Sequence, residues 1–128
     1  MKRLKSFALS EDEIQTQYFR WVFAQERVYP ELRWVCHIPN GGSRHPLEAV
    51  KLKRMGIRAG VADVFIPNPN PFAASKGLWI EFKSLNGKQS SSQKSFTLAM
   101  SLSGYKYEIC RTSQAAINLT KSYLRIGN

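Results

Sequence analysis

The chain has 128 residues, of which 19 are Lys or Arg and nine are Asp or Glu, giving a net charge of +10. A chain of this length is expected to form one domain, residues 1–128, around a single modest core. No uninterrupted apolar run approaches 18 residues, so neither a membrane span nor a signal peptide is expected. The basic balance favours a polyanionic partner, most simply nucleic acid, although any generally cationic surface would show it too.

The first predicted element is a helix that begins at Ser10. Ser10 and Glu13 have the spacing of a capping box, and apolar residues follow at helical spacing. Pro30 is expected to end this unit. The run 32–38 is strand-like, and a turn is predicted at 39–42, where two glycines allow positive φ.

The later elements alternate between helix and strand. They are a helix at 46–55, strands at 61–66 and 78–84, a helix at 90–102, a strand at 105–111 and a helix at 114–126. The Pro/Asn/Ala-rich loop 67–77 is expected to be mobile, and Phe96, Ala99 and Met100 are expected to face the core. This order predicts an α/β sandwich with a central mixed four-stranded sheet flanked by helices.

The chain contains two cysteines, Cys36 and Cys110. Each lies in apolar, strand-like sequence, without CxxC spacing or a nearby histidine that would complete a zinc site. We therefore expect two buried, reduced thiols in a cytoplasmic protein.

Three charged residues mark two of the predicted strands. Asp63 opens one apolar run, and Glu81 and Lys83 lie two positions apart on the next. Because side chains alternate along a strand, Glu81 and Lys83 point one way and Phe82 the other. If the strands are neighbours, the two carboxylates and the lysine converge. Two carboxylates suit Mg²⁺, and a lysine beside them can activate water and neutralise charge on phosphorus, a pattern typical of phosphodiester hydrolysis.

A salt bridge across the strands, facing solvent, would produce the same pattern without any chemistry. Both runs are, however, nearly continuously apolar, as expected for central strands covered on both faces. Ionisable groups in such strands rarely lack a partner or a function. The location therefore favours a site.

Five ordered blocks of the sequence resemble the virus-type replication–repair nuclease (VRR-NUC) domain, a branch of the PD-(D/E)XK nuclease superfamily. The blocks are Glu11 to Trp21, Ile38 to Gly42, Lys53 to Asp63, Ile80 to Lys83 and Ser90 to Gln93. Ala62 stands where the superfamily pattern has proline, which affects backbone rigidity at that position rather than a reactive group.

The resemblance implies a role for each residue of the site. Asp63, Glu81 and the main-chain carbonyl of Phe82 would bind Mg²⁺ or Mn²⁺, and Lys83 would activate water. Glu11 would reach the metal directly or through water, and Gln15 and Gln93 would line the same cleft. The residues alone also allow simpler explanations. Glu11 could be an exposed acid favoured by the helix dipole, and Gln15 and Gln93 could each be a solvated helix residue.

A second group of residues is predicted to contact DNA. Asn40 and Arg44 belong to a turn whose amides and cation suit a phosphate oxygen, although a plain turn explains its glycines as well. The basic cluster could guide a nucleic-acid backbone towards Asp63 or simply form a solvated helix face; its members are Lys51, Lys53, Arg54 and Arg58.

The sequence therefore predicts a Mg²⁺- or Mn²⁺-dependent DNA endonuclease without a small-molecule cofactor. The resemblance implies a virus-encoded protein of the bacterial host cytoplasm that acts on branched DNA such as four-way junctions. Two incisions in opposed strands favour a homodimer, with Phe72, Tyr123 and Leu124 as candidate interface residues. The alternatives are a non-catalytic nucleic-acid-binding module and a nuclease acting on RNA or linear DNA.

Overall fold

Four α-helices, four strands and two short 3-10 helices form the described part of the chain, residues 8–40 and 45–127 of a computed structural model. In chain order they are α1 (Glu11–Gln25), η1 (Pro30–Trp34), β1 (Cys36–His37), α2 (Pro46–Arg54), β2 (Val64–Ile66), η2 (Pro71–Ala73), β3 (Leu78–Phe82), α3 (Ser91–Leu102), β4 (Lys106–Cys110) and α4 (Ser113–Leu124). The predicted α/β class is confirmed.

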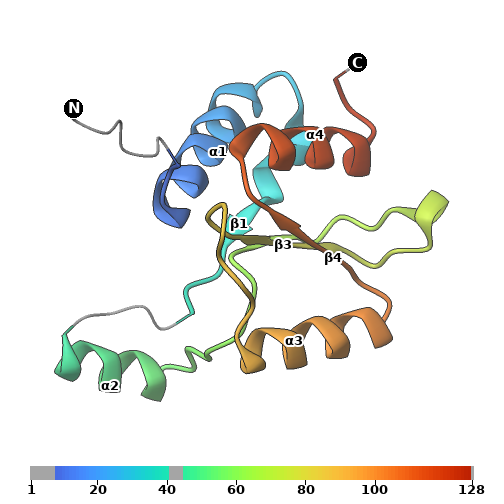
Figure 1. The fold of residues 1–128 in the computed structure, drawn as a ribbon. Coiled ribbons are helices and arrows are strands. Elements are labelled where there is room, and N and C mark those ends of the chain that lie inside the picture. The colour runs from blue at the N-terminus through green and yellow to red at the C-terminus, as the bar shows by residue number, and fades with distance from the viewer. Residues whose placement is uncertain (1–7, 41–44, 128) are drawn as a thin grey trace, which may run out of the picture.

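The strands form one mixed sheet in the order β1-β2-β3-β4 (Figure 1). β1 pairs antiparallel with β2, and β2 antiparallel with β3, with Val64 opposite Ile80. β3 and β4 are parallel, and the helix α3 provides the crossover that a parallel pair requires. The two longest strands therefore lie together, and β2 brings Asp63 next to the end of β3.

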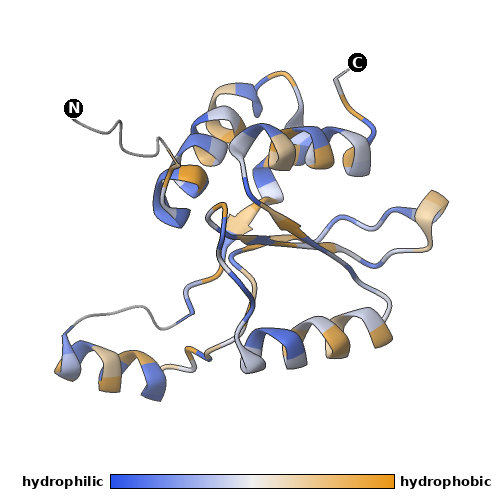
Figure 2. Ribbon diagram, viewed as in Figure 1, coloured by the Kyte–Doolittle hydropathy of each residue, from blue (hydrophilic) through white to orange (hydrophobic). Residues whose placement is uncertain are grey.

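Helices α1 and α4 cover one face of the sheet, and α3 lies on the opposite face (Figure 1). The core lies between the sheet and the α1/α4 layer, where Tyr18 packs on Phe82 with ring centroids 5.6 Å apart. The buried Tyr18 hydroxyl is satisfied by Thr120, 2.7 Å away on α4. Figure 2 shows the hydrophobic colour on the strands and in bands on α1 and α4, as this layering requires.

Helix α1 begins as predicted, because the Ser10 side chain accepts from the Glu13 amide and the Glu13 carboxylate accepts from the Ser10 amide. Ile14, Tyr18 and Val22 repeat every four residues and form its buried stripe. The helix ends at Gln25, earlier than predicted. Pro30 instead occupies the first turn of η1, where its missing N–H costs nothing.

The strand predicted at 32–38 is mostly wrong. Residues 30–34 form η1, which buries Leu32, and only Cys36–His37 pairs with the sheet, as an edge strand. Cys36 is consequently exposed, which corrects its predicted burial. Cys110 is buried as predicted, and burial raises the pKa of its thiol to about 11.

The loop 67–77 is tied to the body of the protein, which corrects its predicted mobility. The Asn70 side chain donates to the Tyr123 carbonyl at 3.0 Å, and the Tyr123 hydroxyl donates to the Asn68 carbonyl at 2.6 Å. Phe72, at the tip, is 78% exposed. Tyr123 is buried and therefore cannot form an interface with a partner.

Helices α2 and α3 bury no residue completely. Phe96 packs edge-on against Trp79 with centroids 4.9 Å apart, but Ala99 is exposed, contrary to its predicted place in the core. The α3 side of the sheet is thus more open than the α1/α4 side. No helix in residues 8–40 or 45–127 is long and apolar enough to cross a membrane.

Candidate active site

Asp63 lies directly before β2, beside the end of β3. Its Oδ2 accepts a hydrogen bond of 2.7 Å from the main-chain N–H of Phe82, and its Oδ1 accepts one of 3.3 Å from the Asn40 side chain. The N–H and C=O of a strand residue point to the same side. The Phe82 carbonyl therefore faces the side of β3 on which Asp63 lies.

Glu81 lies in β3 with its side chain on the α3 side of the sheet, and this side chain is only 1% exposed. Burial raises the pKa of its carboxyl group to about 9, and the negative charge of Asp63 adds to this effect. The ammonium group of Lys83 opposes it, lowering the pKa. Asp63, Glu81 and Lys83 therefore lie close enough for their charges to interact, as the alternation of the two strands predicts.

Gln93 orients Glu81 from the first turn of α3. Its Nε2 donates to Glu81 Oε2 at 3.3 Å, while its Oε1 accepts from the Ser90 N–H at 2.8 Å. The second bond belongs to the capping box that starts α3, and Ser90 returns it by accepting from the Gln93 N–H. The helix cap thus fixes which end of the Gln93 amide faces the carboxylate.

Lys83 follows β3 and is 7% exposed. Its N–H donates to the Cys110 carbonyl at 3.1 Å, so the backbone of β3 continues beside β4. The next loop folds over the lysine stem, where a Cβ on Gly87 would lie 3.4 Å from Lys83 Cδ. Arg111 holds that loop by donating to the carbonyls of Ser84 and Gly87, each at 2.8 Å.

Glu11 and Gln15 lie farther from the buried carboxylates. Glu11 is exposed in the first turn of α1, and its charge makes the smallest contribution to the raised pKa of Glu81. Gln15, one turn later, lines a shallow depression with Phe19 and Arg20. Glu11 therefore makes no direct contact with Glu81 in this structure, and its predicted role at the metal stays a prediction.

The donor set fits a hard divalent cation. Glu81 Oε1 is buried and has no hydrogen-bond partner, an arrangement that is costly unless another group completes it. Asp63 and the Phe82 carbonyl lie on the same side. Within the described ranges, no three His, Cys, Asp or Glu side chains are grouped to hold a metal. Mg²⁺ needs only one or two carboxylates because it keeps several waters.

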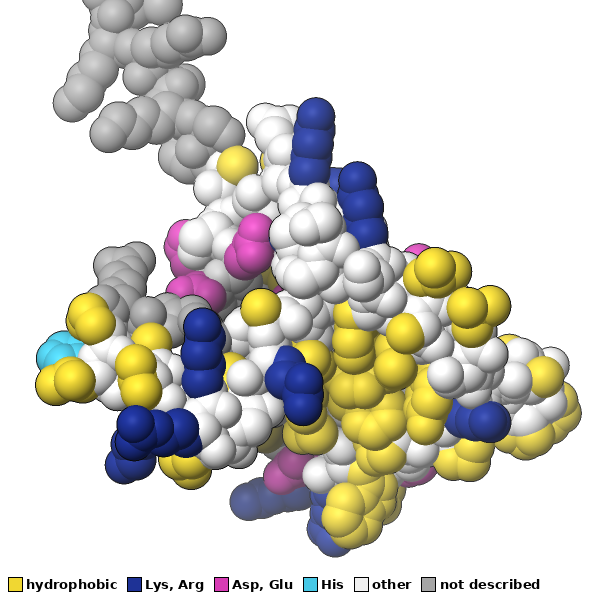
Figure 3. Space-filling model, turned by 90° about the horizontal axis from the view of Figure 1, so that it is seen from below, with side chains coloured by type: hydrophobic (Ala, Val, Ile, Leu, Met, Phe, Trp, Pro, Cys, Tyr) yellow, Lys and Arg dark blue, Asp and Glu magenta, His cyan; other side chains and the backbone are white. Residues whose placement is uncertain are grey.

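The residues predicted to contact DNA differ in their exposure to solvent. Asn40 is half-buried and hydrogen-bonds within the protein, and Arg44 lies outside the described residues. The remaining four are exposed, three in the last turn of α2 and one in the segment that leads to Asp63; they are Lys51, Lys53, Arg54 and Arg58. Figure 3, which views the α2 and α3 side, shows Lys and Arg side chains around α2 and hydrophobic ones gathered over α3.

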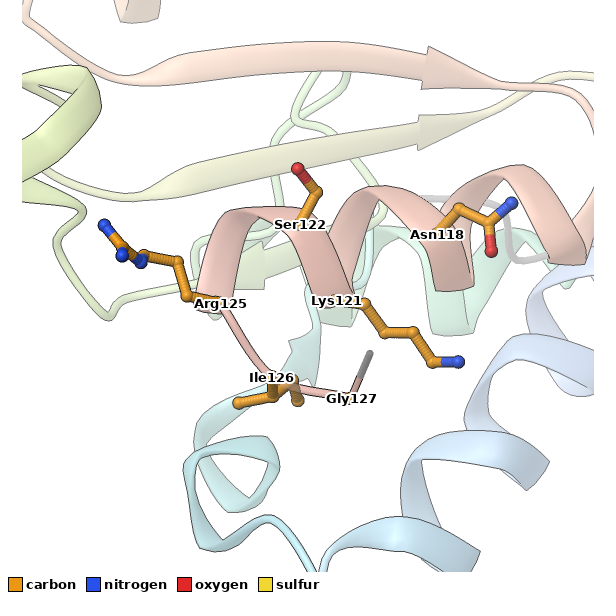
Figure 4. Close-up of a pocket in the computed structure, with 6 residues that line it drawn as sticks. All are labelled: Asn118, Lys121, Ser122, Arg125, Ile126 and Gly127. Atoms are coloured by element: carbon orange, nitrogen blue, oxygen red, sulfur yellow. The ribbon is translucent and has the colours of Figure 1, made fainter.

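A depression of about 530 Å³ lies at the end of α4, on the layer that covers the other face of the sheet. Lys121 and Arg125 line it but project in opposite directions (Figure 4). Arg125 instead lies over the Phe72 ring, 3.7 Å from its centroid. The two cations therefore do not converge on one ligand.

Tyr107 on β4 is a neighbour of the site that the sequence analysis missed. Burial raises the pKa of its hydroxyl, and the charges of Glu81 and Asp63 raise it further. Its hydroxyl accepts a hydrogen bond of 3.0 Å from Gln89. The parallel register, in which Glu81 is opposite Ile109 and Trp79 opposite Tyr107, places it on the same face. Strand alternation alone could have indicated this face, but not the register.

Comparison with solved structures finds a protein named "VRR_NUC domain protein" with a TM-score of 0.73 and 28% sequence identity. The match covers 94% of this chain and 93% of the other. No protein-family model and no curated protein matches the sequence.

Proposed function

We propose that this chain, which is similar over 94% of its length to a VRR-NUC domain protein, is a metal-dependent DNA endonuclease. The observation that carries the proposal is the pair Asp63 and Glu81, with one buried Glu81 oxygen left without a partner. An acidic pair in which one member is buried is unfavourable alone and suits a divalent cation.

Different residues would bind the cation and carry out the chemistry. Asp63, Glu81 and the Phe82 carbonyl would hold Mg²⁺ or Mn²⁺, with Glu11 acting through water. The cation, when bound, would polarise the scissile phosphate and lower the pKa of a water molecule. Lys83 would orient the attacking water and stabilise negative charge as it develops on the phosphoryl oxygens. Gln93 keeps Glu81 directed into the site.

DNA would approach over the α3 side of the sheet. That side carries the carboxylates, while the exposed cations of α2 and Arg58 lie on the chain that leads to Asp63. Phosphate contacts supply most of the affinity of such proteins.

The direct test compares cleavage of linear, flap and four-way DNA by the pure protein, with Mg²⁺, with Mn²⁺ and with EDTA. We expect cation-dependent cleavage, and we expect Asp63→Asn to abolish it while DNA binding is retained, because the variant keeps the size of the side chain and loses a charged ligand. Glu108→Gln, an exposed carboxylate on β4, is the matched control and should cleave normally.

Near-normal cleavage by Asp63→Asn would exclude the proposed site. DNA binding without cleavage in either cation would favour a non-catalytic binding module, and preference for RNA in the same panel would favour a ribonuclease. The finer proposal is a virus-encoded homodimer in the bacterial cytoplasm that acts on four-way junctions, and it rests on family resemblance. The branched substrates test its preference for junctions.

A further inference from the structure

The segment 37–40, which begins at the last residue of β1, holds the segment 61–63 in place. His37 Nδ1 lies 2.7 Å from the Asp63 carbonyl, and the Ile38 N–H donates to the same oxygen at 2.8 Å. The Asn40 side chain donates to the Val61 carbonyl at 3.0 Å. Three contacts from one short segment therefore fix the backbone on both sides of Ala62.

These contacts matter because residue 62 is alanine. Proline at that position would restrict the backbone through its ring, whereas alanine leaves φ free to vary. In this chain the rigidity at Asp63 comes from hydrogen bonds instead. Ala62 itself is fully buried.

Asn40 also contacts the Asp63 carboxylate, with Nδ2 donating to Oδ1 at 3.3 Å. The orientation of its amide is determined by chemistry, because the Val61 carbonyl can only accept and must face the nitrogen. The Phe82 N–H occupies the other carboxylate oxygen. Two donors therefore set both the position and the rotation of the Asp63 carboxylate.

We infer that Asn40 is a positioning residue that orients Asp63 for cation binding, an inference that rests on the proposed function. A neutral donor suits this task, since a lysine or arginine would cancel the charge that attracts the cation. Both amide hydrogens of Asn40 are engaged inside the protein. Its side chain therefore acts through Asp63 and does not supply the phosphate contact that the turn sequence suggested.

The test uses the full chain with Asn40→Ala and Asn40→Ser. Mn²⁺ affinity is measured by electron paramagnetic resonance without DNA, DNA affinity by fluorescence anisotropy in EDTA, and kcat at saturating DNA in Mn²⁺. For Asn40→Ala we expect Mn²⁺ affinity and kcat to fall about 10- to 100-fold, the usual effect of removing a group that orients a metal ligand. DNA affinity in EDTA should stay unchanged.

Asn40→Ser retains a hydroxyl donor and should lie between the wild type and Asn40→Ala, and it is the variant to use if alanine impairs folding. Asn118→Ala, an exposed asparagine on α4, is the matched control and should change none of the three quantities. Weaker DNA binding with normal Mn²⁺ affinity would overturn the inference, as would no change at all. If Mn²⁺ affinity depends on Asn40 but the wild-type protein cleaves no nucleic acid, the nuclease proposal is overturned and the inference about Asn40 stands.

Discussion

Glu81 is almost fully buried beside Asp63, so without a cation the pair retains a proton near neutral pH. The pKa of Glu81 is raised from 4.5 to about 9, so the folded state holds a proton that the unfolded chain has released. Metal-free stability should therefore fall as the pH rises through this range, by at most about 1.4 kcal/mol per pH unit. Urea unfolding in EDTA across the range measures the slope, and Glu81→Gln should flatten it.

Glu108→Gln provides the control for that slope, because Glu108 lies exposed on the neighbouring strand β4. It makes the same change of charge without altering a buried group, and its pH profile should match the wild type. A Glu81→Gln profile that keeps the wild-type slope would show that another group holds the proton.

At the scale of elements, the start of α3 couples helix capping to the site, because Ser90 fixes the Gln93 amide that contacts Glu81. Ser90→Ala should lower the free energy of unfolding by about 1 kcal/mol through the lost cap. It should also reduce kcat, because losing the Ser90 hydroxyl loosens the first turn of α3, and Gln93 lies in that turn. Chemical denaturation and cleavage kinetics on the same sample measure both effects.

Thr112→Ala removes the cap of α4, where the Thr112 hydroxyl accepts from the Ala115 N–H at 3.0 Å. Its cost in stability should be similar, but kcat should be unaffected, because α4 covers the other face of the sheet (Figure 1). Equal losses of kcat in the two variants would mean that general destabilisation, not Gln93, explains the effect.

Helix α2 is the second element with a separable role, since it buries none of its residues and ends in Lys51, Lys53 and Arg54. Replacing these three by glutamine should leave the unfolding free energy unchanged and weaken DNA binding. The slope of log K against log salt should become shallower by about 0.9 for each lost phosphate contact on duplex DNA. Anisotropy titrations over a range of salt concentrations measure the slope.

The matched control for α2 is a triple glutamine variant of cations outside it, Arg20, Lys106 and Lys121. It changes the net charge equally, so a purely global effect of charge would produce the same loss in both variants. An unchanged slope in the α2 variant would place the DNA path elsewhere.

At the scale of the whole molecule, one domain with one site makes one incision at a time. Symmetric cleavage of a four-way junction needs two sites, which a two-fold dimer supplies. We expect light scattering to detect a dimer, alone or with junction DNA, and we expect paired cuts in opposed strands. The buried Tyr123 is excluded from the interface, whereas Phe72 remains available at the tip of the loop 67–77.

A monomer under both conditions would contradict this prediction. So would paired cuts that are no more frequent in a junction than in linear duplex. Either result would leave a nuclease that nicks one strand at a time, without affecting the assignment of Asp63 and Glu81.

The sequence alone determined the features that depend on local periodicity. The capping box at Ser10 and the central strands follow from residue spacing, and the grouping of Asp63 with Glu81 and Lys83 follows from alternation along adjacent strands. These features need only neighbouring residues or neighbouring elements. They were therefore predictable without knowledge of distant contacts.

Only the tertiary structure decided which side chains meet across distant parts of the chain. The exposure of Cys36 follows from the edge position of β1, and the role of Asn40 follows from its contact with Asp63, 23 residues later. Tyr107 joined the site through the register of a parallel pair. Burial and hydrogen-bond partners depend on which surfaces the fold covers, and this is a property of the packed chain rather than of any local pattern.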